Sequence, residues 1–170
     1  MAQPKNKLLH RLSDLTLAAI PVLQAKGFEK LPVSWCEFGY HGGIGYIYVL
    51  VRVHQDNVEI IKIIIAYFGN GIGAEFTVLQ SSTSIENIDV DRVLLCLAKS
   101  KWRRFNDLRR RSFWDRLLGC RKHLCVTHKS EQGIKKDLER VDALLRDDFE
   151  NIDYFFEKWY EENTPLEIKS

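Results

Sequence analysis

The sequence predicts an α+β fold: an antiparallel sheet of three or four strands packed against an N-terminal helix and a C-terminal helical hairpin. Three observations predict it. Apolar residues recur at helical spacing near the N-terminus, β-branched and aromatic residues dominate residues 33–80, and helical spacing returns over 84–162. The 170 residues contain no internal repeat and no obvious linker, so we expect a single domain over 1–170.

The first predicted element is an amphipathic helix over residues 5–26. Gly27 follows it as the expected C-cap, and Pro21 should kink the helix or separate its last turn. Five apolar residues form one stripe along this helix at spacings of three and four: Leu8, Leu12, Leu15, Ala19 and Leu23.

The second block predicts an antiparallel meander of up to four strands. Residues 45–54 alternate in the period of two that is typical of a strand. Turn-forming residues at 55–57 and glycine-rich stretches separate the strands. The four predicted strands cover residues 33–40, 45–54, 58–68 and 75–80.

Residues 58–68 are compatible with either of two structures. Glu59, Lys62 and Ala66 fall three and four apart, as on the polar face of a helix. Asp56 and Glu59 also have the spacing of a capping pair. The five isoleucines of this stretch favour a strand, which is the interpretation we adopt.

The third block is predicted to be helical. Asp89 can cap a first helix. A second helix is expected over residues 99–122, with an apolar stripe that ends before Gly119. Ser130 begins a last helical stretch that reaches Trp159. This stretch fits a single long helix or two helices with a tight joint near Asp147 equally well.

Residues 99–122, the basic segment, dominate the charge pattern. The segment holds ten Lys or Arg and two acids, a net charge of +8, whereas the whole chain carries +2. Such a block attracts an anion, which can be nucleic acid, an acidic protein or the acidic C-terminal part of the same chain. Residues 131–163, with eleven acids and five bases, supply that internal alternative.

The basic segment supplies the predicted partner-binding residues. In a helix, arginines seven residues apart share one side, and their planar guanidinium groups suit carboxylates and phosphates. Tryptophans within the segment also have the character of base-stacking groups, although they fall near its apolar stripe. The predicted partner-binding residues are Arg103, Arg104, Arg110, Arg111 and Trp114.

A cysteine and histidine cluster follows the basic segment. Two thiols and two imidazoles form the ligand set of a tetrahedral zinc site. The four residues fall within nine positions, which is too tight for the usual paired ligands, so we expect no metal and no cofactor. A metal site on Cys120, His123, Cys125 and His128 is the minor alternative.

No motif in the chain names a reaction. We therefore predict a non-catalytic binding protein, such as an inhibitor, an immunity-type protein or an accessory regulator, that engages an anionic macromolecule through residues 99–122. The alternative is nucleic-acid binding by the same segment, and a metal-dependent hydrolase or nuclease is a third interpretation. We expect a cytoplasmic protein without a membrane span, and the C-terminal apolar stripe allows self-association.

Overall fold

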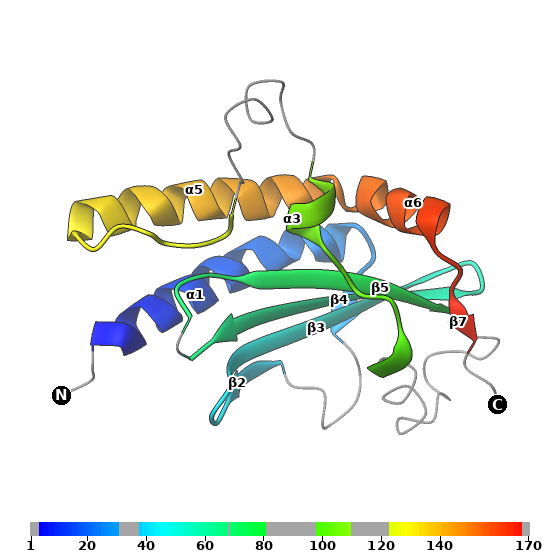
Figure 1. The fold of residues 1–170 in the computed structure, drawn as a ribbon, viewed down its shortest axis with the longest axis horizontal. Helices are drawn as coiled ribbons and strands as arrows, with labels where there is room; N and C mark the ends of the chain where they lie inside the picture. The colour runs from blue at the N-terminus through cyan, green and yellow to red at the C-terminus, as the bar shows by residue number, and fades with distance from the viewer. Residues whose placement is uncertain (1–3, 31–37, 68, 81–97, 110–122, 168–170) are drawn as a thin grey trace.

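The computed structural model describes residues 4–30, 38–67, 69–80, 98–109 and 123–167. Within these residues the chain forms two layers, with the long helices on one side of a twisted sheet (Figure 1). The α+β class is therefore confirmed. The predicted helix beginning at Asp89 and residues 33–37 of the strand predicted over 33–40 lie outside the described residues.

The sheet is wider than the three or four strands predicted, and it is mixed. Among the described residues it contains seven strands in the order β1-β3-β4-β5-β6, with β2 also paired to β3, and β7 running parallel to β5. The additional strands are only two or three residues long, too short to produce a period in the sequence. The strands are β1 (Glu29–Lys30), β2 (Gly39–His41), β3 (Gly45–His54), β4 (Asn57–Ala66), β5 (Gly73–Gln80), β6 (Arg103–Arg104) and β7 (Leu166–Glu167).

The three long strands confirm the predicted meander, including a strand at residues 58–66. Strands β3 and β4 pair along their whole length, with Arg52 opposite Glu59 and Gly45 opposite Ala66. Gly45 begins β3 with φ of 126°, and a Cβ atom there would lie 2.0 Å from the Ile65 carbonyl oxygen. Only glycine fits this start of the hairpin.

The core lies between the sheet and the helices. Alternate residues of the three long strands, such as Leu50, Ile61 and Phe76, are fully buried in one cluster with residues of the helices. The Phe76 ring stacks on Phe105 at 5.0 Å between centroids and meets Phe156 edge-on at 5.1 Å. This aromatic contact joins the sheet to the C-terminal helices.

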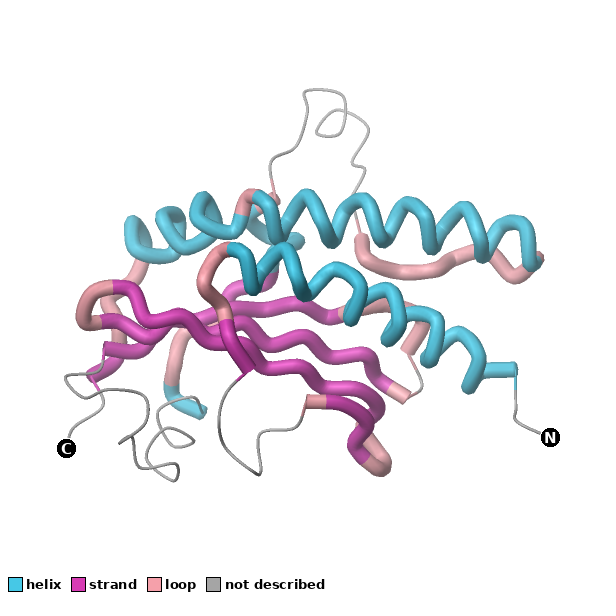
Figure 2. Tube along the Cα trace, turned by 180° about the vertical axis from the view of Figure 1, so that it is seen from behind, coloured by secondary structure: helices cyan, strands magenta, loops and turns pink. Residues whose placement is uncertain are grey.

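Helix α1 (Pro4–Ala25) confirms the predicted N-terminal helix and continues through Pro21. It ends before Gly27, which adopts φ of 85°. Helix α1 lies beside α5 (Glu131–Glu150) over the same face of the sheet (Figure 2). Arg11 Nη1 lies 2.8 Å from Glu131 Oε1 where the two helices meet. None of the described helices is long and apolar enough to span a bilayer.

The predicted C-terminal helices are confirmed, but the two that the structure describes follow one another in line and do not form a hairpin (Figure 1). Helix α6 (Ile152–Glu162) follows α5 after a break at Asn151, so the interpretation as two helices is the correct one. The basic segment, predicted as a helix over 99–122, contains β6 and the short helix α3 (Phe105–Leu108) in its described part. Hydrogen bonding of β6 to the edge of β5 replaces the helix there. Residues 110–122 lie outside the described part of the chain.

The apolar stripe of α5 and α6 is used by the core. Leu145, Phe149, Phe156 and Trp159 are each at most 2% exposed. The stripe therefore gives self-association no support.

Residues 123–128 attach to the turn that precedes β5. The Ile72 amide donates to the Leu124 carbonyl at 2.7 Å, and the Val126 amide donates to the Asn70 carbonyl at 2.7 Å. Gly71 lies opposite Cys125 in this bridge. A Cβ atom on Gly71 would lie 2.4 Å from the Leu124 carbonyl oxygen, so the close approach requires glycine.

The first prediction concerns this close approach. Gly71→Ala should lower the free energy of unfolding by about 1–3 kcal/mol, because the added methyl group forces two backbone segments apart. Urea denaturation measures the loss. Gly42→Ala is the matched control, since a Cβ atom at Gly42 would meet no atom within 4 Å. Equal stabilities of the two variants would contradict the packing described here.

Candidate functional site

The described part of the basic segment separates into fixed and exposed cations. Lys99, Lys101 and Arg104 are exposed. None of these three side chains forms an ion pair or a hydrogen bond with the described part of the chain. Arg103 and Arg109, in contrast, bind carboxylates of the C-terminal helices. The other predicted partner-binding residues, Arg110, Arg111 and Trp114, lie outside the described residues.

The strongest attachment is the buried pair between Arg109 and Asp148 of α5. Arg109 Nε donates to Asp148 Oδ1 at 2.7 Å, and Arg109 Nη2 donates to Asp148 Oδ2. The side chains are 5% and 0% exposed. Burial raises the pKa of the Asp148 carboxyl, and the bonds from Arg109 offset only part of that effect. Such a pair is costly to break because either partner alone would be an uncompensated buried charge.

Weaker contacts fix the residues before Arg109. Arg103 Nη1 lies 2.8 Å from Glu162 Oε2 at the end of α6. The Lys101 carbonyl oxygen accepts hydrogen bonds from Trp159 Nε1 at 2.9 Å and from the Thr77 hydroxyl at 3.2 Å. Residues 101–109 are therefore held between β5 and the C-terminal helices. The acidic C-terminal part neutralises two of the segment's arginines internally.

Arg103 and Arg104, which the sequence predicted on a helix, lie on strand β6 and point to different faces of the sheet. In β6, neighbouring side chains point to opposite faces, so Arg103 is half-buried and Arg104 is exposed. The preceding residue, Trp102, has the Lys62 ammonium 4.2 Å from its ring centroid. Lys62 in turn lies 2.5 Å from Glu75 on β5. One face of the Trp102 ring is thus occupied within the protein.

The cysteine and histidine cluster does not form a metal site in the described residues. His123, Cys125 and His128 line a cleft of about 480 Å³ together with Asp137 and Arg140 of α5. Nowhere in the described ranges are three or more His, Cys, Asp or Glu side chains arranged to hold a metal ion. Cys120, the fourth predicted ligand, lies outside those ranges.

Asp137 is the acceptor that holds residues 127–128 against α5. Its Oδ2 accepts the Thr127 amide at 2.6 Å and the His128 amide at 3.0 Å, and His128 Nδ1 lies at 3.0 Å. The backbone bonds from His128 and Thr127 hold the pKa of the Asp137 carboxyl well below its usual value. The sequence analysis assigned no role to this residue.

Arg140 completes the attachment one helical turn later. It donates to the His123 carbonyl at 2.7 Å and to the Cys125 carbonyl at 2.5 Å. Asp137 thus accepts from backbone amides and Arg140 donates to backbone carbonyls of the same extended segment, residues 123–128. Their spacing of three residues on a predicted helix is the only sequence signal for this pairing.

Comparison with known proteins assigns no function to these features. The chain matches no protein-family model, no curated protein and no solved structure. Function must therefore be inferred from the geometry of the side chains. The sequence already indicated the basic segment and the acidic C-terminal residues, and the structure shows that they bind each other.

The second prediction tests the buried ion pair. Arg109→Met should lower the free energy of unfolding by about 3–5 kcal/mol, because Asp148 would stay buried without its partner. Urea denaturation measures this loss. Arg103→Met, which breaks a half-exposed pair, is the matched control and should cost about 1 kcal/mol or less. The double variant Arg109→Met/Asp148→Leu should regain stability relative to Arg109→Met, and a further loss would count against the assignment.

The third prediction concerns pH. A carboxyl whose pKa is lowered by folding stabilises the protein above its unfolded pKa, 3.8, and this contribution is lost as the pH falls below that value. Asp137→Asn should therefore lower the Tm at pH 7, and the difference from wild type should shrink between about pH 5 and pH 3. Asp56→Asn, at an exposed turn, should show no such trend. A Tm difference for Asp137→Asn that is constant over this range would refute the assignment.

Proposed function

We propose that the protein is a non-catalytic binding protein that engages an anionic macromolecule through its basic segment. The observation that carries the proposal is the division of the segment's cations. Arg103 and Arg109 are bound to α6 and α5, and the exposed side chains of Lys99, Lys101 and Arg104 form no ion pair or hydrogen bond with the described residues. Charges presented on a fixed backbone lose little conformational entropy when a partner binds.

The anionic partner that we favour is the acidic surface of another protein. The segment's own arginines bind carboxylates, Asp148 and Glu162, in the geometry that such a surface would offer. Base stacking, which single-strand binders commonly use, is disfavoured at Trp102 because the Lys62 ammonium occupies one face of its ring. An inhibitor, an immunity-type protein or an accessory regulator would act in this way.

The segment's charge also suits rapid and selective encounter. Its net charge of +8 contrasts with the excess of acids in the rest of the chain, so positive charge is concentrated in one stretch of the sequence. Complementary charge steers association and disfavours partners of the wrong sign. Cys125 is a free thiol, which supports the cytoplasmic location included in the proposal.

The fourth prediction removes the exposed cations. The triple variant Lys99→Ala/Lys101→Ala/Arg104→Ala should bind fluorescein-labelled polyglutamate about tenfold more weakly than wild type, because three charged contacts are lost. Fluorescence anisotropy at 0.1 M salt measures the affinity. The matched control is Lys129→Ala/Lys135→Ala/Lys136→Ala, which removes three exposed charges near the start of α5 and the same net charge. Equal weakening by both variants would reject the segment as the binding surface.

A single-stranded oligothymidylate distinguishes the nucleic-acid alternative. Binding to phosphates weakens linearly on a plot of log affinity against log salt, with a slope set by the number of phosphates contacted. We expect the wild-type protein to prefer polyglutamate to the oligonucleotide at equal ionic strength. Tighter binding of the oligonucleotide, with a steep slope that the triple variant reduces, would replace the acidic-protein proposal with nucleic-acid binding.

A further inference from the structure

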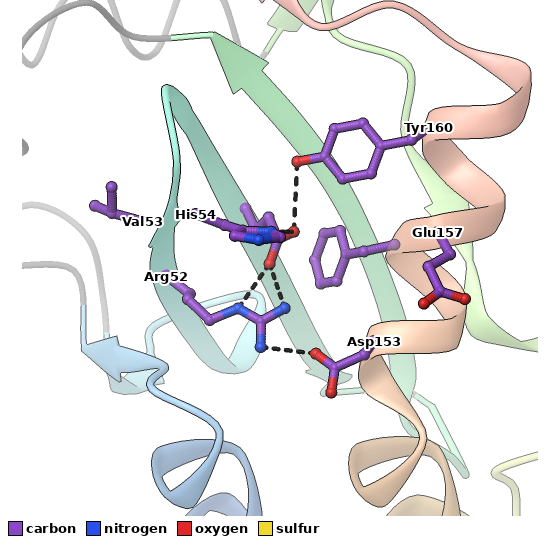
Figure 3. Close-up of a pocket in the computed structure, with 8 residues that line it drawn as sticks. Arg52, Val53, His54, Asp153, Glu157 and Tyr160 are labelled. Atoms are coloured by element: carbon purple, nitrogen blue, oxygen red, sulfur yellow. Dashed lines mark hydrogen bonds and ion pairs between the residues drawn. The ribbon is translucent and has the colours of Figure 1, made fainter.

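A second cleft lies far along the chain from the basic segment, between the turn end of the β3–β4 hairpin and α6. Its volume is about 370 Å³. Figure 3 shows Arg52 and His54 on the hairpin facing Asp153 and Tyr160 on α6. The buried carboxylate of Glu59, opposite Arg52 in the hairpin, belongs to the same lining.

Arg52 is paired with two carboxylates of the protein, so its charge is already compensated. Its Nε donates to Glu59 Oε2 at 2.7 Å, and its Nη1 donates to Asp153 Oδ1 at 2.8 Å. The guanidinium also lies 4.6 Å from the centroid of the Phe28 ring. Burial alone would raise the pKa of Asp153, but the hydrogen bonds from Arg52 and Lys26 outweigh it and hold the pKa below its usual value.

Glu59 has one well-bound oxygen and one weakly bound oxygen. Its side chain is 1% exposed, and Oε2 is held by Arg52. Among the described residues, Oε1 has two long contacts and no shorter one, 3.3 Å from His54 Nδ1 and 3.4 Å from the Tyr160 hydroxyl. Both exceed the ordinary range for these bonds. A buried carboxylate oxygen in this state gains stability from a closer charged donor.

The lining also carries more negative than positive charge. Glu59, Asp153 and Glu157 contribute three carboxylates, whereas Arg52 contributes the one guanidinium. Glu157 is exposed and forms no ion pair with the part of the chain that the structure describes. Burial, together with the nearby Glu59 carboxylate, raises the pKa of Tyr160, so its hydroxyl stays protonated and adds no charge.

His54 is the side chain that can move aside. It is 56% exposed, and its contact with Glu59 is long. A cationic donor that entered the cleft would replace this contact with a shorter, charge-assisted hydrogen bond. Glu157 would then lie beside the incoming charge at the rim of the cleft.

We propose that this cleft binds a cationic group, an ammonium or a guanidinium, that donates to Glu59 Oε1 in place of His54. The group belongs to a free amine or to a Lys or Arg side chain of a partner protein. The proposal is independent of the basic segment, which would bind an anion. A macromolecular partner with both kinds of charge would occupy both sites.

The fifth prediction uses methylguanidinium chloride as the probe. Titration followed by amide NMR should shift the resonances of residues around His54 and Tyr160. Glu157→Gln should weaken binding about threefold, because one exposed carboxylate at the rim is lost. The matched control, Glu139→Gln, removes an exposed carboxylate of α5 away from the cleft and should leave the affinity unchanged. His54→Ala should bind equally or more tightly.

The outcomes separate the proposal from general charge attraction. Equal weakening by Glu157→Gln and Glu139→Gln, or loss of binding in His54→Ala, would overturn it. Failure of both methylguanidinium and the peptide acetyl-Gly-Arg-Gly-amide to shift these resonances would also overturn it. Tighter binding of the peptide than of methylguanidinium assigns the cleft to a partner's side chain, and equal binding assigns it to a small free cation, with the cationic class supported in either case.

Discussion

A buried carboxylate needs a hydrogen-bond donor or a cation from within the protein, and this constraint organises the described structure. Glu59, Asp137 and Asp148 are each at most 5% exposed. Arg52 satisfies Glu59, two backbone amides satisfy Asp137, and Arg109 satisfies Asp148. The Glu59 contact ties neighbouring strands of one hairpin, whereas Asp137 holds residues 127–128 on α5 and Asp148 holds Arg109 on α5. The hydrophobic core brings the two layers together, and the contacts of Asp137 and Asp148 attach a loop and the basic segment to α5.

The same constraint explains why net charge is a poor guide to an open surface. The basic segment is strongly positive as a sequence, yet Arg103 and Arg109 are bound to α6 and α5. A partner can bind only those charged side chains that form no ion pair within the protein. At the cleft on α6 the unused charge is negative instead. Arg52 is bound to Asp153, and Glu157 forms no ion pair among the described residues. The helix thus separates a positive region from a negative cleft.

The sequence predicted the parts of the fold that repeat over many residues. Period-two alternation identified the long strands, and apolar spacing identified α1, α5 and α6. The short edge strands could not be found, because two residues such as Arg103 and Arg104 are extended only where β5 offers free backbone groups. Of the sites, the Arg52–Glu59 pair was not predicted, because residues 55–57 were all expected in the turn, whereas the observed hairpin pairs His54 with Asn57 and so places Arg52 opposite Glu59. Asp137 was missed as well, because its shortest bond comes from a backbone amide, which leaves no side-chain pattern.

The bridge between Gly71 and Cys125 has a consequence for how this chain can diverge. The backbone at Gly71 lies so close to the backbone at Cys125 that any side chain at position 71 would force the two segments apart. Evolution should therefore retain Gly71 together with the attachment of residues 123–128, or change both. In homologous sequences, a change at position 71 should therefore be accompanied by a change in residues 123–128.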